Sequence, residues 1–161
     1  MNFLFEQKVI QNTGLAAEAI WQATNEAYNG KGKTEGVAFP LIFLVLPLAF
    51  HQRTAEALAK KQQSGAIFKA IAEDREITVG LQARMEALSG RTMEALSIGF
   101  HSGLLVLDQG QQRQILPGRK SAPVAHVTDE VKTVLAAAKR VGFAFAEMTT
   151  EQLSTHLNIR F

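Results

Sequence analysis

Two stretches of the chain combine residue types that bind nucleotides. Residues 27 to 34 read Ala-x-x-x-x-Gly-Lys-Thr, the relaxed form of a phosphate-binding loop, and residues 104 to 108 read Leu-Leu-Val-Leu-Asp, like an apolar strand ending on a magnesium-binding aspartate. Such a loop needs a helix directly after it, because backbone N–H groups must point at the phosphate. Ala27 is instead expected to close an amphipathic helix, and Gly36 and Pro40 oppose a continuous helix after the loop. Nucleotide binding through Gly32, Lys33 and Thr34 is therefore the third of three hypotheses.

The histidines and serines form no recognisable catalytic or metal-binding pattern. The four histidines lie on separate predicted elements without HxxxH or HExxH spacing, at His51, His101, His126 and His156. Ser102 follows His101 directly, but adjacent residues at a helix end point in different directions, and Ser-Gly is typical of a helix stop. The chain has no cysteine, which excludes disulfides and thiolate metal sites. We therefore expect no metal, no cofactor and no enzymatic activity.

The element around which the rest must pack is an apolar run from Val37 to Phe50 without a polar side chain. A helix needs about 20 residues to span a bilayer, and this shorter run contains Pro40 and Pro47, so it predicts a buried core element and no membrane span. Two interpretations stay open: a helix that Pro47 kinks, or a buried strand from Val37 to Leu46 before a helix. Its aromatic residues could be internal or could dock a partner: Phe39, Phe43 and Phe50.

Length and composition predict a single domain, residues 1–161. The chain has 161 residues, of which 47% are hydrophobic, enough for a substantial core. The first 11 residues contain Glu6 and Lys8 and no small-residue cleavage site, so they do not resemble a secretory signal. Together with the absence of cysteine, this favours a cytoplasmic location.

The remaining pattern predicts a mainly α fold with a small β-hairpin. We expect a helical core over about 12–72, beginning with a helix from Gly14 to Tyr28 capped by Asn12. C-terminal helices are expected over about 128–161, with Thr128 and Thr150 at the starts of two of them.

Between these helices, residues 76–117 predict a winged-helix-like unit. A helix from Glu76 to Leu88 is expected to precede a second helix from Arg91 to His101. The second helix should bury Met93, Leu96 and Phe100. Leu104–Leu107 and Arg113–Leu116 then read as a hairpin, with Asp108 in its turn.

Net charge is +2, but the region from 109 to 140 has six basic and two acidic residues. The basic side chains could contact phosphate or an acidic partner, or could form a solvated surface: Arg113, Arg119, Lys120, Lys132, Lys139 and Arg140. The outward positions of the second helix include Arg91, Glu94 and Ser97, which are poor readers of base edges. A winged helix of this kind is at least as compatible with binding a protein as with binding DNA.

Several motifs resemble one family, the middle component of bacterial three-component ABC systems, of which Lamassu-type antiphage systems are examples. Residues 12–16 read Asn-Thr-Gly-Leu-Ala, residues 43–48 read Phe-Leu-Val-Leu-Pro-Leu, and residues 91–96 read Arg-Thr-Met-Glu-Ala-Leu. The end of the chain, Leu157-Asn-Ile-Arg-Phe161, is similar to the Leu-Gly-Val-Arg-Pro of the family. Asn158 and Phe161 depart from that pattern.

The resemblance implies a non-catalytic adaptor that bridges an SMC/Rad50-like ABC ATPase and an effector, often a nuclease. In that case the chain would contact DNA only as part of the complex. Arg160 and Phe161 become candidate partner contacts, because they close the last family motif. The alternative hypothesis is a winged-helix DNA-binding regulator that uses the basic residues between 113 and 140.

Overall fold

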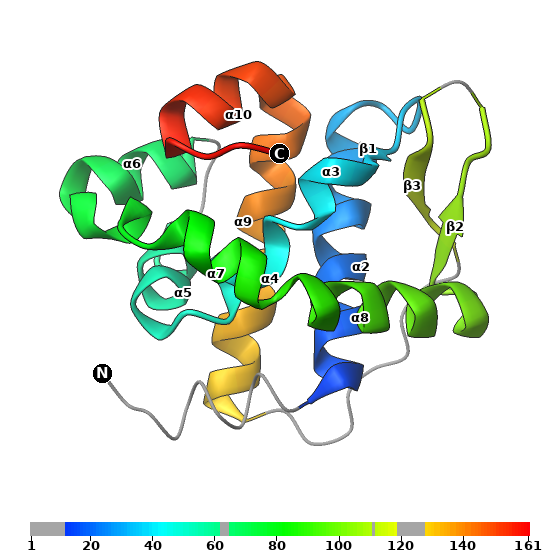
Figure 1. The fold of residues 1–161 in the computed structure, drawn as a ribbon, viewed down its shortest axis with the longest axis horizontal. Coiled ribbons are helices and arrows are strands. Elements are labelled where there is room, and N and C mark those ends of the chain that lie inside the picture. Colours follow the sequence, from blue (N-terminus) through cyan, green and yellow to red (C-terminus); the bar gives the residue numbers. More distant parts are fainter. Residues whose placement is uncertain (1–11, 62–64, 111, 119–127) are drawn as a thin grey trace.

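The computed structural model describes residues 12–61, 65–110, 112–118 and 128–161. Two long helices form its centre, α2 (Thr13–Gly30) and α9 (Asp129–Glu147), which pack side by side (Figure 1). The close approach depends on small residues, since a Cβ built on Gly142 would lie only 2.3 Å from the carbonyl oxygen of Ala23. As predicted, Asn12 caps α2: its side-chain oxygen accepts a hydrogen bond from the Leu15 N–H at 2.9 Å.

The apolar run forms a short strand and two short helices. β1 (Val37–Ala38) leads into α3 (Phe39–Ile42), and α4 (Val45–Ala49) follows after a two-residue break. The long strand to Leu46 is wrong. The expected helix has Pro40 in its first turn, as predicted, but it is divided into α3 and α4 at Phe43 and Leu44, before Pro47. Both prolines lie in first turns, where the missing N–H costs no hydrogen bond, and this explains why the run divides into two helices.

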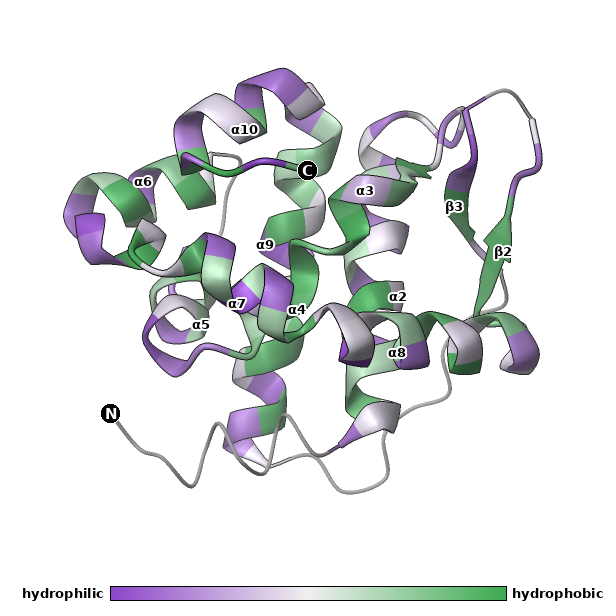
Figure 2. Cartoon of the chain, viewed as in Figure 1, coloured by the Kyte–Doolittle hydropathy of each residue, from purple (hydrophilic) through white to green (hydrophobic). Residues whose placement is uncertain are grey.

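α4 is the buried centre that the sequence predicted. Figure 2 shows that it is hydrophobic over almost all of its length, and it packs against α9 and α2. None of the described helices is by itself long and apolar enough to cross a membrane. One bent pair, Phe39–Ala49 with Gln52–Ala59, passes that test on length and composition only.

A layer of shorter elements covers one side of α9. α5 (Gln52–Ala59) packs against α9, and α6 (Ala66–Glu73) follows it. A 3₁₀ turn, η1 (Arg75–Thr78), then leads towards the next helix.

The helix predicted from Glu76 to Leu88 is wrong as a continuous element. It consists of η1 and α7 (Leu81–Ala87), separated at Gly80, whose φ of +72° is incompatible with a helix. The predicted apolar stripe is nevertheless buried, at Ile77, Leu81 and Met85.

α8 (Ser89–Ser102) follows α7 after a single residue. The prediction that Met93 is buried was wrong: Met93 is 50% exposed, and the adjacent Thr92 is fully buried in its place. The helix is therefore rotated so that smaller residues are buried, including Ala95 and Gly99, and a Cβ built on Gly99 would lie 2.6 Å from the Leu105 side chain.

The hairpin is confirmed, and a third strand joins it. β2 (Leu105–Leu107) and β3 (Gln114–Pro117) are antiparallel, and β1 pairs with the other edge of β3 to give the order β1-β3-β2. Ile115 pairs with both Val37 and Leu107 and is fully buried.

The chain ends by turning back over the molecule. α10 (Thr150–Leu157) begins with a capping box between Thr149 and Gln152. Asn158 adopts the left-handed conformation, φ +53°, and ends the helix. Residues 159–161 then run back in front of α9 towards α3 (Figure 1).

Candidate functional site

The predicted basic residues that the structure describes lie on two different elements, the hairpin and α9. Arg113 lies beside the hairpin turn, whereas Lys132 lies in the first turn of α9. Figure 1 shows that the β2–β3 hairpin and the start of α9 are far apart. The Nζ atom of Lys132 is 3.8 Å from an Asp129 carboxylate oxygen. Farther along α9, Arg140 Nε donates a hydrogen bond to the Lys61 carbonyl and so joins α9 to the end of α5. Arg119 and Lys120 lie outside the described residues, and Lys139 is half-buried on α9.

The nucleotide-loop candidates serve as turn residues. Thr34 Oγ1 donates to the Lys31 carbonyl at 2.7 Å, and the element that follows is strand β1 in place of a helix. Asp108 accepts a hydrogen bond from the Gly110 N–H at 3.1 Å, as expected for a hairpin turn. The geometry that would aim backbone N–H groups at a phosphate is therefore missing at residues 32–34.

The histidines and Ser102 have local structural partners. His101 Nδ1 lies 2.8 Å from the Ser97 carbonyl oxygen, and Ser102 Oγ donates to the Gly99 carbonyl at 3.2 Å. His51 Nδ1 lies 2.8 Å from Thr54 Oγ1. Within the part of the chain that the structure describes, no three His, Asp or Glu side chains are grouped so that they could hold a metal ion. His126 lies outside that part.

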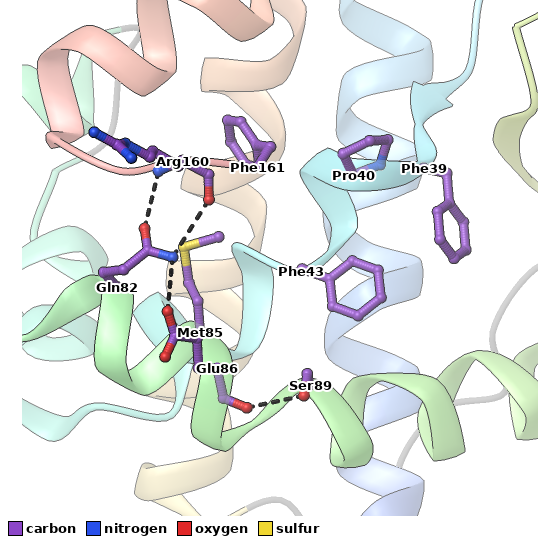
Figure 3. Close-up of a pocket in the computed structure, with 9 residues that line it drawn as sticks. All are labelled: Phe39, Pro40, Phe43, Gln82, Met85, Glu86, Ser89, Arg160 and Phe161. Atoms are coloured by element: carbon purple, nitrogen blue, oxygen red, sulfur yellow. Dashed lines mark hydrogen bonds between the residues drawn. The ribbon is translucent and has the colours of Figure 1, made fainter.

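An apolar groove of about 400 Å³ contains both candidate partner contacts, and we call it the tail groove. It lies between α3, α7 and the tail, residues 159–161, with the start of α8 at one end (Figure 3). Both candidate partner contacts, Arg160 and Phe161, line it. Its apolar walls come from three parts of the sequence: Phe39, Pro40, Phe43, Met85 and Phe161.

Residues of α3 and the position just after it form one wall of the tail groove. Phe39 and Phe43 lie one helical turn apart, and their rings meet edge to face with centroids 5.4 Å apart. Both side chains are half-buried, and Pro40 between them is exposed. Phe50, by contrast, is only 1% exposed. The three aromatic residues of the apolar run therefore divide between groove and core.

The opposite wall is the tail, which α7 and α10 hold in place. The Gln82 side-chain oxygen accepts a hydrogen bond from the Arg160 N–H at 2.9 Å, and Gln82 Nε2 lies 3.4 Å from the Arg160 carbonyl oxygen. Ser154 Oγ donates to the Ile159 carbonyl at 2.5 Å. The Ile159 side chain is buried in the core, with 4% exposed, and so anchors the tail.

Most polar groups of the tail groove are already paired with each other. Glu86 accepts a hydrogen bond from Gln82 Nε2 at 3.2 Å, and Ser89 Oγ donates to the Glu86 carbonyl at 2.8 Å. The Arg160 guanidinium is different, because it has no hydrogen-bond or ion-pair partner among the described residues. The groove thus offers apolar surface with a cation beside it, and no nucleophile with an adjacent base. This composition suits docking of a macromolecule.

Sequence reasoning named Arg160 and Phe161 as candidate partner contacts and left open whether Phe39 and Phe43 dock a partner, but it missed the α7 side of the tail groove. The spacing Phe39-x-x-x-Phe43 places the two rings on one side of a helical turn. Nothing local indicates that Gln82 and Met85 lie opposite that pair, because the groove depends on a contact between residues 78 positions apart.

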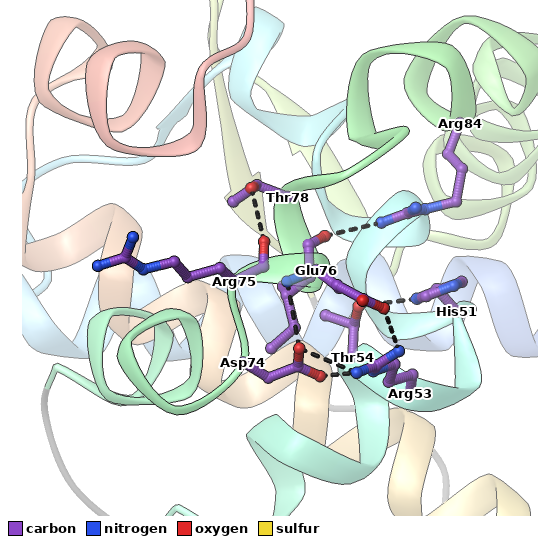
Figure 4. A network of polar contacts seen from close by, with 9 residues as sticks. His51, Arg53, Thr54, Asp74, Arg75, Glu76, Thr78 and Arg84 are labelled. Atoms are coloured by element: carbon purple, nitrogen blue, oxygen red, sulfur yellow. Dashed lines mark hydrogen bonds and ion pairs between the residues drawn. The ribbon is translucent and has the colours of Figure 1, made fainter.

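A separate polar network holds α5 against η1 (Figure 4). The Arg53 guanidinium forms a two-pronged contact with the Asp74 carboxylate and a further ion pair with Glu76. The hydrogen bond from Arg53 is the main reason that the pKa of Asp74 lies below its ordinary value. This network joins α5 to the start of η1, and its charged groups are paired with each other, so we regard it as structural.

Arg84 adds a second link between these short elements. Its guanidinium donates to the carbonyl oxygens of Ile77, Val79 and Pro47 at 2.9–3.3 Å. It thereby ties η1 and α4 to α7, the helix that carries Gln82 and Met85.

The model of one protein family, described as ABC-three component (ABC-3C) system Middle Component 3, matches residues 2–161. The chain belongs to this family. The match spans nearly all of the sequence and covers the residues of the helical core and those that line the tail groove. No curated protein and no solved structure matches the chain significantly.

Proposed function

We propose that this middle component is a non-catalytic adaptor that bridges an SMC/Rad50-like ATPase and an effector, such as a nuclease, in an antiphage defence complex of the Lamassu type. The observation that carries this proposal is the match of residues 2–161 to a middle-component family. A middle component stands between other components of its system, and an adaptor is the simplest role that its name implies. The ATPase would sense foreign or broken DNA, and the adaptor would transmit or restrain the response of the effector.

The chemistry of the surface supports an adaptor. The tail groove is walled by apolar side chains, and its polar groups are largely paired internally, so it can bind but has no group placed to attack a substrate. Apolar grooves of this kind suit the apolar side of a partner segment.

The order α7, α8, β2 and β3 supports the interpretation of residues 76–117 as a winged-helix-like unit. Its second helix favours a protein partner over base reading. Arg91, the basic residue in the first turn of α8, is held by Thr13 Oγ1 and Glu94 at 2.9 and 3.0 Å. Two exposed apolar side chains of α8, Met93 and Ile98, are better suited to a protein surface than to a phosphate backbone.

Pairwise co-purification tests the proposal. The tagged chain is co-expressed in turn with the ATPase and with the effector encoded beside it, and bound proteins are quantified after washing. We expect each to be retained by the tagged chain and neither by the tag alone. Failure of either protein to bind would contradict a bridging role.

A further inference from the structure

We propose that the tail groove binds the apolar ridge of a helix in another component of the complex, and that the Arg160 guanidinium pairs with an acidic residue flanking that ridge. This inference rests on the proposed adaptor function and names the surface and the chemistry of the partner segment.

The shape of the tail groove favours side chains of a protein segment. A groove of about 400 Å³ is at the lower end of the range for ligand sites and has room for a few side chains. Its walls are apolar on both sides, α3 on one and Met85 with Phe161 on the other (Figure 3). A helix that presents apolar residues at positions i and i+4 would fill such a groove.

The apolar surface continues beyond the groove, which favours an elongated partner. Ser89, at one end of the groove, begins α8, and Met93 lies one turn farther along the same side of that helix. The Met93 side chain is 50% exposed, and Phe161 is 42% exposed. A small molecule would fill the groove alone, whereas a helix would also cover Met93.

The positive charge of Arg160 indicates that the residue beside the apolar ridge of the partner helix is acidic. Gln82, Glu86 and Ser89 are joined to one another or to the tail, so they need no external partner. The Arg160 backbone is held by Gln82, but its guanidinium has no partner within the described ranges and extends from the tail away from Phe161 (Figure 3). A segment that leaves the groove across the tail would meet this cation, and a carboxylate would complement it.

Binding measurements with the purified ATPase and the purified effector as probes test the inference. The variant Phe161→Asp places a charge in the groove, and Val106→Asp is its matched control, since Val106 has a similar exposure of 48% and lies on β2, outside the groove. We expect Phe161→Asp to weaken binding of one probe at least about tenfold, and Val106→Asp to leave that binding within about twofold. Unchanged binding of both probes by Phe161→Asp, with an unchanged melting temperature, would overturn the inference.

Salt dependence tests the role of Arg160 separately. Raising salt from about 0.05 to 0.5 M should weaken binding by the wild-type chain more than binding by Arg160→Gln, because screening removes only a charge contact that exists. Lys132→Gln is the control, since Lys132 has an exposed side chain on the first turn of α9. Identical salt dependence of Arg160→Gln and the wild type would refute the acidic partner.

Two outcomes separate this inference from the proposed function. If the wild type binds both probes and the groove variants bind equally well, the adaptor function stands and the groove inference fails. If the wild type binds neither probe, the proposed function itself fails. If light scattering shows that the isolated chain is a dimer that Phe161→Asp dissociates, the occupant is a second copy, and the inference is overturned.

Discussion

The side-chain amide of Gln82 lies against both backbone polar groups of Arg160, with its oxygen 2.9 Å from the N–H and its Nε2 3.4 Å from the carbonyl oxygen. A glutamine on α7 thus takes the place that a neighbouring strand would occupy in a sheet. Because the tail forms one wall of the groove, the shape of the proposed partner site depends on this side chain.

The first prediction concerns that contact. Gln82→Ala should speed amide hydrogen exchange of Arg160 at least about fivefold, because a lost hydrogen bond of about 1 kcal/mol lowers the free energy of local opening. The free energy of global unfolding should fall by less than about 1 kcal/mol, since the contact is at the surface. Gln52→Ala, which removes an exposed contact with Glu56, is the control. Unchanged exchange at Arg160 in Gln82→Ala would show that the tail is held by other contacts.

The second prediction concerns pH. The Arg53 hydrogen bond lowers the pKa of Asp74 in the folded protein below its ordinary value of 3.8. Asp74 therefore stabilises the fold above about pH 4, and this stability is lost as pH falls through the lowered pKa. The melting temperatures of the wild type and Asp74→Asn should differ at pH 7, and the difference should shrink as the pH falls below about 4.

A matched variant controls for the general effect of acid. Asp129 has a fully exposed side chain, so Asp129→Asn should follow the wild type at every pH, apart from a small offset. A difference between wild type and Asp74→Asn that is the same at pH 7 and pH 3 would contradict the assigned role of the ion pair.

The third prediction tests the α2–α9 contact with two glycines. A Cβ on Gly142 would lie 2.3 Å from the Ala23 carbonyl oxygen, so Gly142→Ala should destabilise the fold by about 1–3 kcal/mol. Gly90 lies in the first turn of α8 with no atom in the path of a Cβ, so Gly90→Ala should be neutral or stabilise by up to about 1 kcal/mol. Chemical denaturation measures both. Equal effects of the two substitutions would mean that α2 and α9 are not this close.

The fourth prediction concerns Arg84. Arg84→Met keeps an unbranched apolar side chain but leaves the carbonyls of Ile77, Val79 and Pro47 without this donor. We expect a loss of about 1–3 kcal/mol in unfolding free energy. Arg84→Lys should recover part of it, because an ammonium keeps a donor but lacks the planar fork. Equal stability of Arg84→Met and the wild type would contradict this role.

Local signals predicted much of the fold. The Asn12 and Thr128 caps each have a polar side chain directly before an apolar periodic segment, and each caps a helix as expected. The hairpin followed from two short apolar runs around Asp108 and Gly110. These features depend on residues within a few positions of each other, so the sequence alone contains the information.

Predictions failed where backbone conformation or distant packing decides the outcome. Gly80 breaks the helix expected from Glu76 to Leu88, because its positive φ lets η1 end and α7 begin in a new direction. Met93 fits a buried stripe by spacing, but the small Thr92 and Ala95 allow α8 to approach α2 more closely. The arrangement of the candidate basic residues also depends on distant packing: of those that the structure describes, Arg113 lies beside the hairpin and Lys132, Lys139 and Arg140 lie on α9.

The tail groove could not be predicted for the same reason. The pairing of β1 with β3 and the contact of Gln82 with Arg160 both join residues nearly 80 positions apart. No pattern within a short stretch of the sequence predicts either contact. Arg160 and Phe161 were nevertheless named as candidate partner contacts, because they close the last family motif.

The most direct test of the adaptor claim is a mass measurement of the complex with and without this chain. The ATPase and effector are co-expressed, purified by a tag on the ATPase, and weighed by native mass spectrometry, in the presence of the wild-type chain and in its absence. A bridging role predicts that the effector is retained only when the chain is present, in one assembly that contains all three. Retention of the effector to the same extent without the chain would contradict the account.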